Sequence, residues 1–178
     1  MASNLKKVIL STVYCTLCVF CLSSSKVLAV FWADRNPVDN YAHIAYIAVK
    51  HCNTEILEFL VGNLVDVNYG DTNKTTLLHY SMGRSCHEVK EILIKKGADV
   101  NAIESTTGFT PLHKAAMEGD IRGVRLLLEK GADPYIKEKF NGLMPLDLAM
   151  STLRHLEGKE VRPNQEQRTQ RKIVELLS

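Results

Sequence analysis

The feature that most constrains this chain is a segment that occurs twice, 34 residues apart. Residues 108–133 read GFTPLHKAAMEGDIRGVRLLLEKGAD, and residues 74–99 read KTTLLHYSMGRSCHEVKEILIKKGAD. The two segments align without a gap, so that His79 matches His113 and Gly97 matches Gly131. Repetition at this interval predicts a fold of similar units stacked on one another, because one such unit is too small to bury its own apolar face.

Each segment has the pattern of two short helices with a stop between them. In residues 108–133, Thr110 is a helix N-cap and Pro111 stands at the first helical position, where its missing N–H costs nothing. Gly119 ends the first helix and Asp120 caps the second. Apolar residues recur at helical spacing in both helices, first as Leu112, Ala115 and Ala116 and then as Ile121, Val124, Leu127 and Leu128.

Two weaker copies flank this pair. Residues 43–68 end in ILEFLVGNLVDVN, which corresponds to EILIKKGADVN in the second unit, and NGLMPLDLA from Asn141 corresponds to TGFTPLHKA. A period of 33 to 34 residues with TPLH and GADVN elements resembles the ankyrin-repeat family. The resemblance extends from about residue 40 to the C-terminus.

The resemblance implies an all-α solenoid of about four helix–turn–helix repeats with hairpin loops between them. We place the repeats at about 41–70, 71–103, 105–137 and 139–178, after a lead-in over residues 30–40. The implied function is non-catalytic binding of a protein partner, which the sequence does not identify, without a cofactor. The residues of the structural repeat motif are His79, Gly97, Thr110, Pro111, Leu112, His113 and Gly131.

The helix pairs follow from this register. We expect the helices of the first three repeats at 42–50 and 54–62, at 77–84 and 87–96, and at 111–118 and 121–130. The first helix of repeat four is expected to continue through residues 151–157, and its second helix to cover residues 171–177. The polar stretch between them contains Pro163, so residues 157–170 are either a loop or an early start of the last helix from about Asn164. The lead-in is expected to be extended.

Residues 1–29 have the pattern of a signal peptide. Lys6 and Lys7 precede an uncharged run from Val8 to Leu22, and short side chains at Val27 and Ala29 suit cleavage after Ala29. The run is shorter than the roughly 20 residues that span a bilayer. We therefore expect export through the secretory pathway, to the periplasm or the exterior. The alternative is an uncleaved membrane anchor formed by residues 8–25.

The five cysteines fall into two groups. Cys15, Cys18 and Cys21 lie inside the hydrophobic run, where a metal site would have no polar surroundings. Cys52 and Cys86 stand at nearly equivalent points of adjacent repeats. Stacked helices lie roughly 8–10 Å apart, beyond the ~7 Å limit between the Cα atoms of a disulfide. We therefore expect free thiols and no metal site.

Charge and motif content argue against several classes of function. Outside residues 1–29, 19 basic residues face 20 acidic ones, so the repeats lack the clustered basic charge of a nucleic-acid-binding protein. The sequence has no glycine-rich phosphate loop. His79 and His113 have no nucleophile and orienting acid beside them, so we assign them to hydrogen bonds with the loop backbone and expect no catalytic residues.

The residues expected to contact a partner follow from the resemblance. In ankyrin-repeat proteins, partners bind the hairpin tips and the exposed face of the first helix of each pair. In this sequence these positions are Thr72, Asn73, Thr75, Arg84, Thr106, Thr107, Phe109, Met117, Glu118, Phe140 and Leu143. Exposed aromatic and methionine side chains are frequent interface anchors, although Phe109 and Phe140 would equally serve to pack one repeat on the next. We expect a monomer that touches a membrane only if residues 8–25 remain attached.

Overall fold

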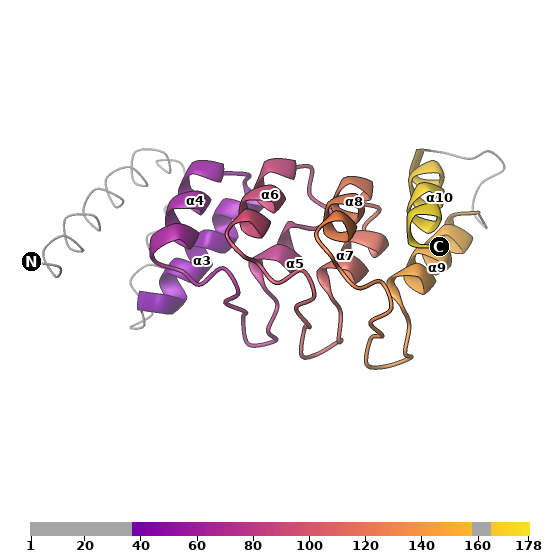
Figure 1. The fold of residues 1–178 in the computed structure, drawn as a ribbon, viewed down its shortest axis with the longest axis horizontal. Coiled ribbons are helices and arrows are strands. Elements are labelled where there is room, and N and C mark those ends of the chain that lie inside the picture. Colours follow the sequence, from indigo (N-terminus) through magenta and orange to yellow (C-terminus); the bar gives the residue numbers. More distant parts are fainter. Residues whose placement is uncertain (1–36, 158–164) are drawn as a thin grey trace, which may run out of the picture. The chain divides into compact units, whose positions relative to one another are not determined.

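A computed structural model describes residues 37–157 and 165–178 of the chain (Figure 1). Residues 41–178 form one compact unit. The expected signal peptide or anchor, and the expected cleavage after Ala29, lie outside the described residues. Within the described ranges, no helix combines the length and the apolar character needed to cross a lipid bilayer.

The described part of the chain contains eight helices and no strand. They are α3 (Pro37–Lys50), α4 (Thr54–Asn63), α5 (Leu77–Ser81), α6 (His87–Lys95), α7 (Pro111–Met117), α8 (Ile121–Glu129), α9 (Pro145–Glu157) and α10 (Gln165–Leu177). In Figure 1 the helices follow one another as pairs, and the loops that connect successive pairs project on the same side. The all-α repeat architecture with hairpin loops is therefore confirmed.

The helices begin where the sequence places capping residues. Asn53 accepts a hydrogen bond from the N–H of Ile56 at 3.0 Å, and Asp120 accepts one from Gly123 at 2.8 Å. Each bond satisfies a backbone donor that has no partner inside its helix. Helices α6 and α8 end before a glycine with positive φ, Gly97 at 91° and Gly131 at 84°, a conformation that costs other residues free energy.

The core is a continuous layer of aliphatic side chains from all four helix pairs. Its fully buried members include Leu57, Leu60, Leu78, Leu93, Leu112, Leu127 and Ile173. Alanines at Ala45, Ala115, Ala116 and Ala149 allow the first helices of successive pairs to approach closely, since each is 0% exposed. Every pair thus completes the core of its neighbour, as repeat proteins require.

Two expected boundaries at the ends of the repeat domain need revision. Helix α3 begins at Pro37, so residues 37–40 are helical and the expected extended lead-in to residue 40 is wrong there. Proline is well suited to a first helical position, because its φ is already near the helical value. Helix α10 begins at Gln165, in agreement with the early-start alternative for repeat four. Residues 158–164 lie outside the described ranges.

Helix α5 is shorter than expected and ends at Ser81 instead of residue 84. Met82 leaves the helix with extended dihedral angles, φ −68° and ψ 150°, and Gly83 follows with a positive φ of 73°. Glycine accepts this conformation without strain, so the helix ends three residues earlier than expected.

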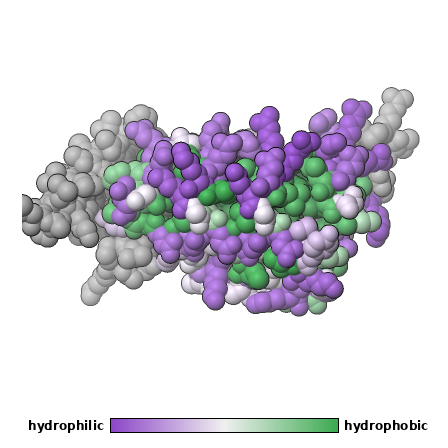
Figure 2. Space-filling model, viewed as in Figure 1, coloured by the Kyte–Doolittle hydropathy of each residue, from purple (hydrophilic) through white to green (hydrophobic). Residues whose placement is uncertain are grey.

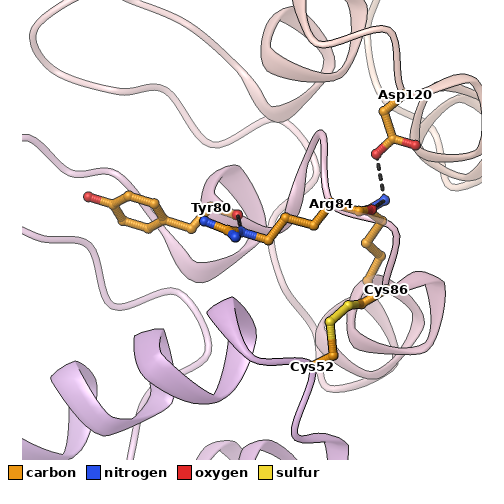
Figure 3. The surroundings of a disulfide bond; sticks show 6 residues. Cys52, Tyr80, Arg84, Cys86 and Asp120 are labelled. Atoms are coloured by element: carbon orange, nitrogen blue, oxygen red, sulfur yellow. Dashed lines mark hydrogen bonds and ion pairs between the residues drawn. A yellow bond between two sulfur atoms is a disulfide. The ribbon is translucent and has the colours of Figure 1, made fainter.

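The expectation of free thiols at Cys52 and Cys86 is wrong. The two cysteines form a disulfide, with their Cα atoms 5.7 Å apart (Figure 3). The separation of helix axes does not apply here, because neither residue lies within a helix: Cys52 is in the turn before α4, and Cys86 is the N-cap of α6. Cys52 has a positive φ of 58°, which corresponds to the turn glycine Gly119 of repeat three, with φ 72°.

Candidate functional site

Three hairpins, at residues 66–76, 99–110 and 133–144, connect successive helix pairs. A carboxylate organises each of them. Asp71 accepts hydrogen bonds from the N–H groups of Asn73 and Thr75, at 2.8 and 3.0 Å. Glu138 accepts from the N–H groups of Phe140 at 2.7 Å and of Leu143 at 3.3 Å. These bonds fix the shape of the loop, since they satisfy backbone donors that no strand partner reaches.

Glu104 occupies the same place in the middle hairpin. It is buried, accepts from the Thr107 hydroxyl at 3.0 Å, and forms an ion pair with Lys114 at 3.3 Å. Its other oxygen accepts from the hydroxyl of Thr75, in the preceding hairpin, at 3.3 Å. The carboxylate therefore holds two hairpins together as well as shaping its own.

The hydrogen bonds shift the acidity of these carboxyl groups. Burial alone would raise the pKa of Asp71, but bonds from the Tyr80 hydroxyl and from the backbone of Thr75 and Asn73 outweigh it, and the pKa lies below its ordinary value. The backbone N–H of Phe140 is the main cause of a lowered pKa at Glu138. Both groups are therefore held as acceptors at neutral pH.

The histidines of the repeat motif connect each first helix to the next hairpin. His79 Nε2 lies 3.1 Å from the carbonyl oxygen of Phe109, and His113 Nε2 lies 3.2 Å from that of Leu143. On the other side of each ring, Nδ1 accepts from the N–H of Thr76 or Thr110, at 3.2 and 3.1 Å. The expected hydrogen bonds to loop backbone are confirmed. Repeat four carries Asp147 at this position, and its carboxylate keeps the inner bond, from Met144 N–H at 2.8 Å.

These contacts favour neutral imidazoles. Burial lowers the pKa of both His79 and His113, and the nearby carbonyl acceptors only partly oppose it. A neutral ring with its proton on Nε2 satisfies both contacts, since Nε2 faces a carbonyl oxygen and Nδ1 faces an N–H. This geometry suits a structural bridge.

A second set of bonds ties the base of each hairpin to the next. Asn68 accepts from the N–H of Asp99 at 2.7 Å and donates to the carbonyl of Gly97 at 3.1 Å. Asn101 repeats this one unit later, accepting from Asp133 N–H at 2.8 Å. Because each hairpin is bonded to its neighbours, the loops form a fixed surface before any partner arrives.

The expected partner residues divide into exposed and packed ones. Thr72, Asn73, Thr106, Met117, Glu118 and Phe140 are exposed. Phe140 stands out, with 71% of its surface accessible, and Met117 has 37%. Figure 2 shows apolar surface between bands of hydrophilic side chains on one face of the molecule.

The remaining expected residues contribute mainly to packing. Phe109 is half-buried and stacks on the His113 ring, with centroids 5.4 Å apart, while the Lys114 ammonium lies 5.2 Å from its centroid. Thr75 is 8% exposed and faces Glu104, so it does not face solvent. Arg84 is half-buried and donates to the carbonyl of Tyr80 at 2.9 Å (Figure 3). Thr107 and Leu143 are half-buried.

Sequence reasoning missed three exposed apolar side chains: Tyr135 at 75%, Ile103 at 49% and Met150 at 43%. Tyr135 aligns with Asn101 at the repeat offset, so a large aromatic replaces a polar loop residue there, and this departure was readable from the sequence. Between the first two hairpins lies an open groove of about 500 Å³, lined by Asn68, Gly70, Lys74, Thr76, Asp99, Ala102 and Ile103.

Among the described residues, no group of three or more His, Cys, Asp or Glu side chains is placed to hold a metal ion. The sulfur atoms of Cys52 and Cys86 are bonded to each other.

Comparison with known proteins gives one consistent result. A family model described as "Ankyrin repeats (3 copies)" matches residues 44–138. The 2-5A-dependent ribonuclease of Mus musculus is 51% identical over 57 residues, which is 32% of this chain and 8% of that protein. Palmitoyltransferase Hip14 of Drosophila melanogaster is 37% identical over 73 residues, covering 41% of this chain and 12% of that protein.

A viral relative matches more of the chain. Putative ankyrin repeat protein FPV031 of fowlpox virus (strain NVSL) is 36% identical over 110 residues, which is 59% of this chain and 32% of that protein. The chain therefore spans between 8% and 32% of the length of these three relatives.

Proposed function

Because the chain belongs to the ankyrin-repeat family, whose repeats are protein–protein interaction modules, we propose that it is an exported binding protein that acts without catalysis. Its partner contacts the hairpin tips and the exposed faces of the first helices of the repeats. Ankyrin repeats are generally non-enzymatic. The relatives named for a ribonuclease and a palmitoyltransferase match over a small share of their own length, so their activities are not transferred to this chain.

The observation that carries the proposal is the exposure of Tyr135 and Phe140 on one hairpin. Both rings are more than two-thirds accessible, 75% and 71%, on a loop whose backbone is fixed by Glu138 and by His113. Two exposed aromatic rings on a rigid loop lose little conformational entropy when they are buried by a partner. Large aromatic anchors of this kind carry much of the free energy of protein association.

The disulfide supports the proposal of export. Bonds between cysteines persist in oxidising compartments outside the cytosol, and Cys52–Cys86 joins two adjacent repeats. Residues 1–29 have the basic and apolar regions of a signal peptide. The alternative is an anchor through residues 8–25 that holds the repeats at a membrane surface. N-terminal sequencing of the protein from its producing cells distinguishes them, since cleavage gives a chain that starts at Val30.

A site-specific photo-crosslinker tests the binding surface. Placed at Phe140, it should capture a protein partner in the native compartment. The matched control is the same crosslinker at Arg125, an exposed position on α8, away from the hairpins. Capture from Arg125 without capture from Phe140 would move the binding surface to the second helices and overturn this assignment.

A further inference from the structure

The first helix of repeat one carries a tyrosine at the position where repeats two and three carry a bridging histidine. In repeats two and three, His79 and His113 connect the first helix to the carbonyl of the next hairpin. In the register that aligns Asn53 with the N-caps Cys86 and Asp120, the corresponding residue of repeat one is Tyr46, which is half-buried. The Tyr46 ring packs edge-to-face on that of Tyr80, with centroids 4.6 Å apart, and α3 also contributes Ala45, Ala48 and Val49 to the apolar core.

The disulfide lies at this same contact. Cys52 follows α3 directly, and Cys86 is the N-cap of α6 in repeat two, so the bond joins the turn of the first helix pair to the second pair (Figure 3). Asn68 also connects repeats one and two, but it does so from the hairpin and not from α3 or its turn. The covalent link thus reaches α6 at Cys86, the residue that corresponds to Asp120 at the next contact along the chain.

The next contact along the chain is held differently. Lys90 is buried, with 1% of its surface exposed. Its ammonium forms an ion pair with Asp120 of repeat three and donates a hydrogen bond to the carbonyl of Arg84 at 2.8 Å. Asp120 also accepts from Gly83 N–H at 3.2 Å. Because these bonds do not involve the sulfur atoms, repeats two and three stay joined whether or not the disulfide is intact.

The two sulfur positions differ in access. Cys52 is exposed and Cys86 is half-buried. A thiolate from solvent therefore reaches the sulfur of Cys52 more easily. The departing sulfur is then that of Cys86, at the N-terminus of the nine-residue helix α6, and a helix N-terminus favours negative charge.

We propose that Cys52–Cys86 is a reducible clamp, a thiol–disulfide exchange site for a dithiol reductant that controls the docking of repeat one. One thiolate of the dithiol attacks Cys52 Sγ, the bond to Cys86 breaks, and Cys86 leaves as a thiolate. The second thiol of the reductant then displaces Cys52, so that the reductant becomes a disulfide and both cysteines gain a proton. Two electrons pass from the dithiol to the protein. After reduction, α3 and α4 open from the stack while repeats three and four keep their structure. The clamp works independently of which partner the repeats bind.

Hydrogen exchange on the full chain tests the clamp. A variant with Cys15→Ser, Cys18→Ser and Cys21→Ser leaves the pair as the sole reducible site, because these are the other three cysteines. After treatment with dithiothreitol, amide exchange in residues 41–63 should become faster by about tenfold or more, and that in residues 111–132 should stay unchanged. A Cys52→Ser, Cys86→Ser variant should show the fast pattern without reductant.

Both other outcomes contradict the clamp. Unchanged exchange in residues 41–63, with reduction verified by mass spectrometry, would show that noncovalent contacts hold repeat one without the disulfide. Loss of protection in all repeats would show that the disulfide supports the whole fold and does not act locally. Brief treatment with glutathione shows which sulfur is attacked first. The tryptic peptide of residues 51–74, which contains Cys52, should carry the mixed disulfide. A mixed disulfide on the peptide of residues 85–90 would instead show that Cys86 is the attacked sulfur.

Discussion

Lys90 and Asp120 form a buried ion pair between two neighbouring repeats, and their side chains are 2% and 9% exposed. Lys90 stands on the core side of α6, at the position held by Leu57 in α4 and Val124 in α8, both 0% exposed. Asp120 is the N-cap of α8. A buried charge is tolerated only when it is paired and hydrogen-bonded, so each of these residues depends on the other repeat being in place.

Asp120→Asn should destabilise the protein more than Lys90→Met. Asparagine still caps α8, but it leaves the Lys90 ammonium with the carbonyl of Arg84 as its remaining acceptor. The expected loss is about 3 kcal/mol or more of unfolding free energy. Lys90→Met leaves Asp120 bonded to the N–H groups of Gly83 and Gly123, and should cost about 1 kcal/mol. Urea denaturation followed by circular dichroism measures both.

The double variant decides whether the two effects share one cause. Because the penalty of Asp120→Asn comes from an unpaired ammonium, adding Lys90→Met should restore stability relative to Asp120→Asn alone. Additive losses would contradict this account. Arg125→Ala, on the exposed face of α8, is the control and should change the free energy by less than about 0.5 kcal/mol.

The protein should lose stability as the pH falls from 7.5 to 5.5. The pKa of His79 and of His113 is lowered in the folded state by burial, whereas an unfolded chain binds these protons below about pH 6.5. In that window the unfolded state holds more protons, so the unfolding free energy decreases with decreasing pH. Protonation of Nδ1 would also remove the acceptor for Thr76 or Thr110 N–H.

A pair of matched variants isolates this effect. His113→Gln should lower stability at pH 7.5 and reduce its dependence on pH, as measured by urea denaturation at both pH values. His155→Gln, at an exposed position of α9, should leave the dependence unchanged. An equal reduction by both variants would rule out the buried rings as the cause. The window stops at pH 5.5 because the carboxylates of Asp71 and Glu138, whose pKa values are lowered, begin to bind protons only at lower pH.

The repeated scaffold could be predicted from sequence because its signals are local. Thr110, Pro111 and Asp120 fix helix starts through dihedral angles and capping bonds, and the recurrence of His79 and His113 assigns a role to the imidazole. The roles of these residues are set by the few residues that follow them and by the constant spacing between repeats. The end units lack such signals, which is why the start of α3 at Pro37 was missed and that of α10 was left open.

The contacts that differ from repeat to repeat could not be predicted in the same way. Whether Cys52 meets Cys86 depends on the turn geometry at Cys52, whose φ is 58°, and not on the spacing of helices. The pairing of Lys90 depends on a carboxylate 30 residues later in the chain. A lysine in an apolar column of the repeat was a visible anomaly, but the sequence alone does not name its partner.

Gln170 should hold the terminal helix in place. Its side chain is 2% exposed and donates to the carbonyl oxygens of Ala116 at 2.8 Å and Ala149 at 3.2 Å. Gln170→Leu would leave the Ala116 oxygen without this donor and should cost about 2 kcal/mol. It should also increase proteolysis within α10. Gln165→Leu, exposed at the start of the same helix, is the control, and equal sensitivity of both variants would argue against a specific role for Gln170.

Alanine variants of Phe109 and Phe140 should have different effects, the first on stability and the second on partner binding. Phe109 stacks on the His113 ring and lies below the Lys114 ammonium. Phe109→Ala should therefore lower the unfolding free energy by about 1–2 kcal/mol. Phe140 is 71% exposed, so Phe140→Ala should change it by less than about 0.5 kcal/mol. Against a partner captured by crosslinking, Phe140→Ala should weaken binding by at least about tenfold, as expected for an interface anchor, measured by titration calorimetry. If Phe140→Ala lowers stability and leaves binding intact, the ring belongs to the fold and the binding surface must be sought elsewhere.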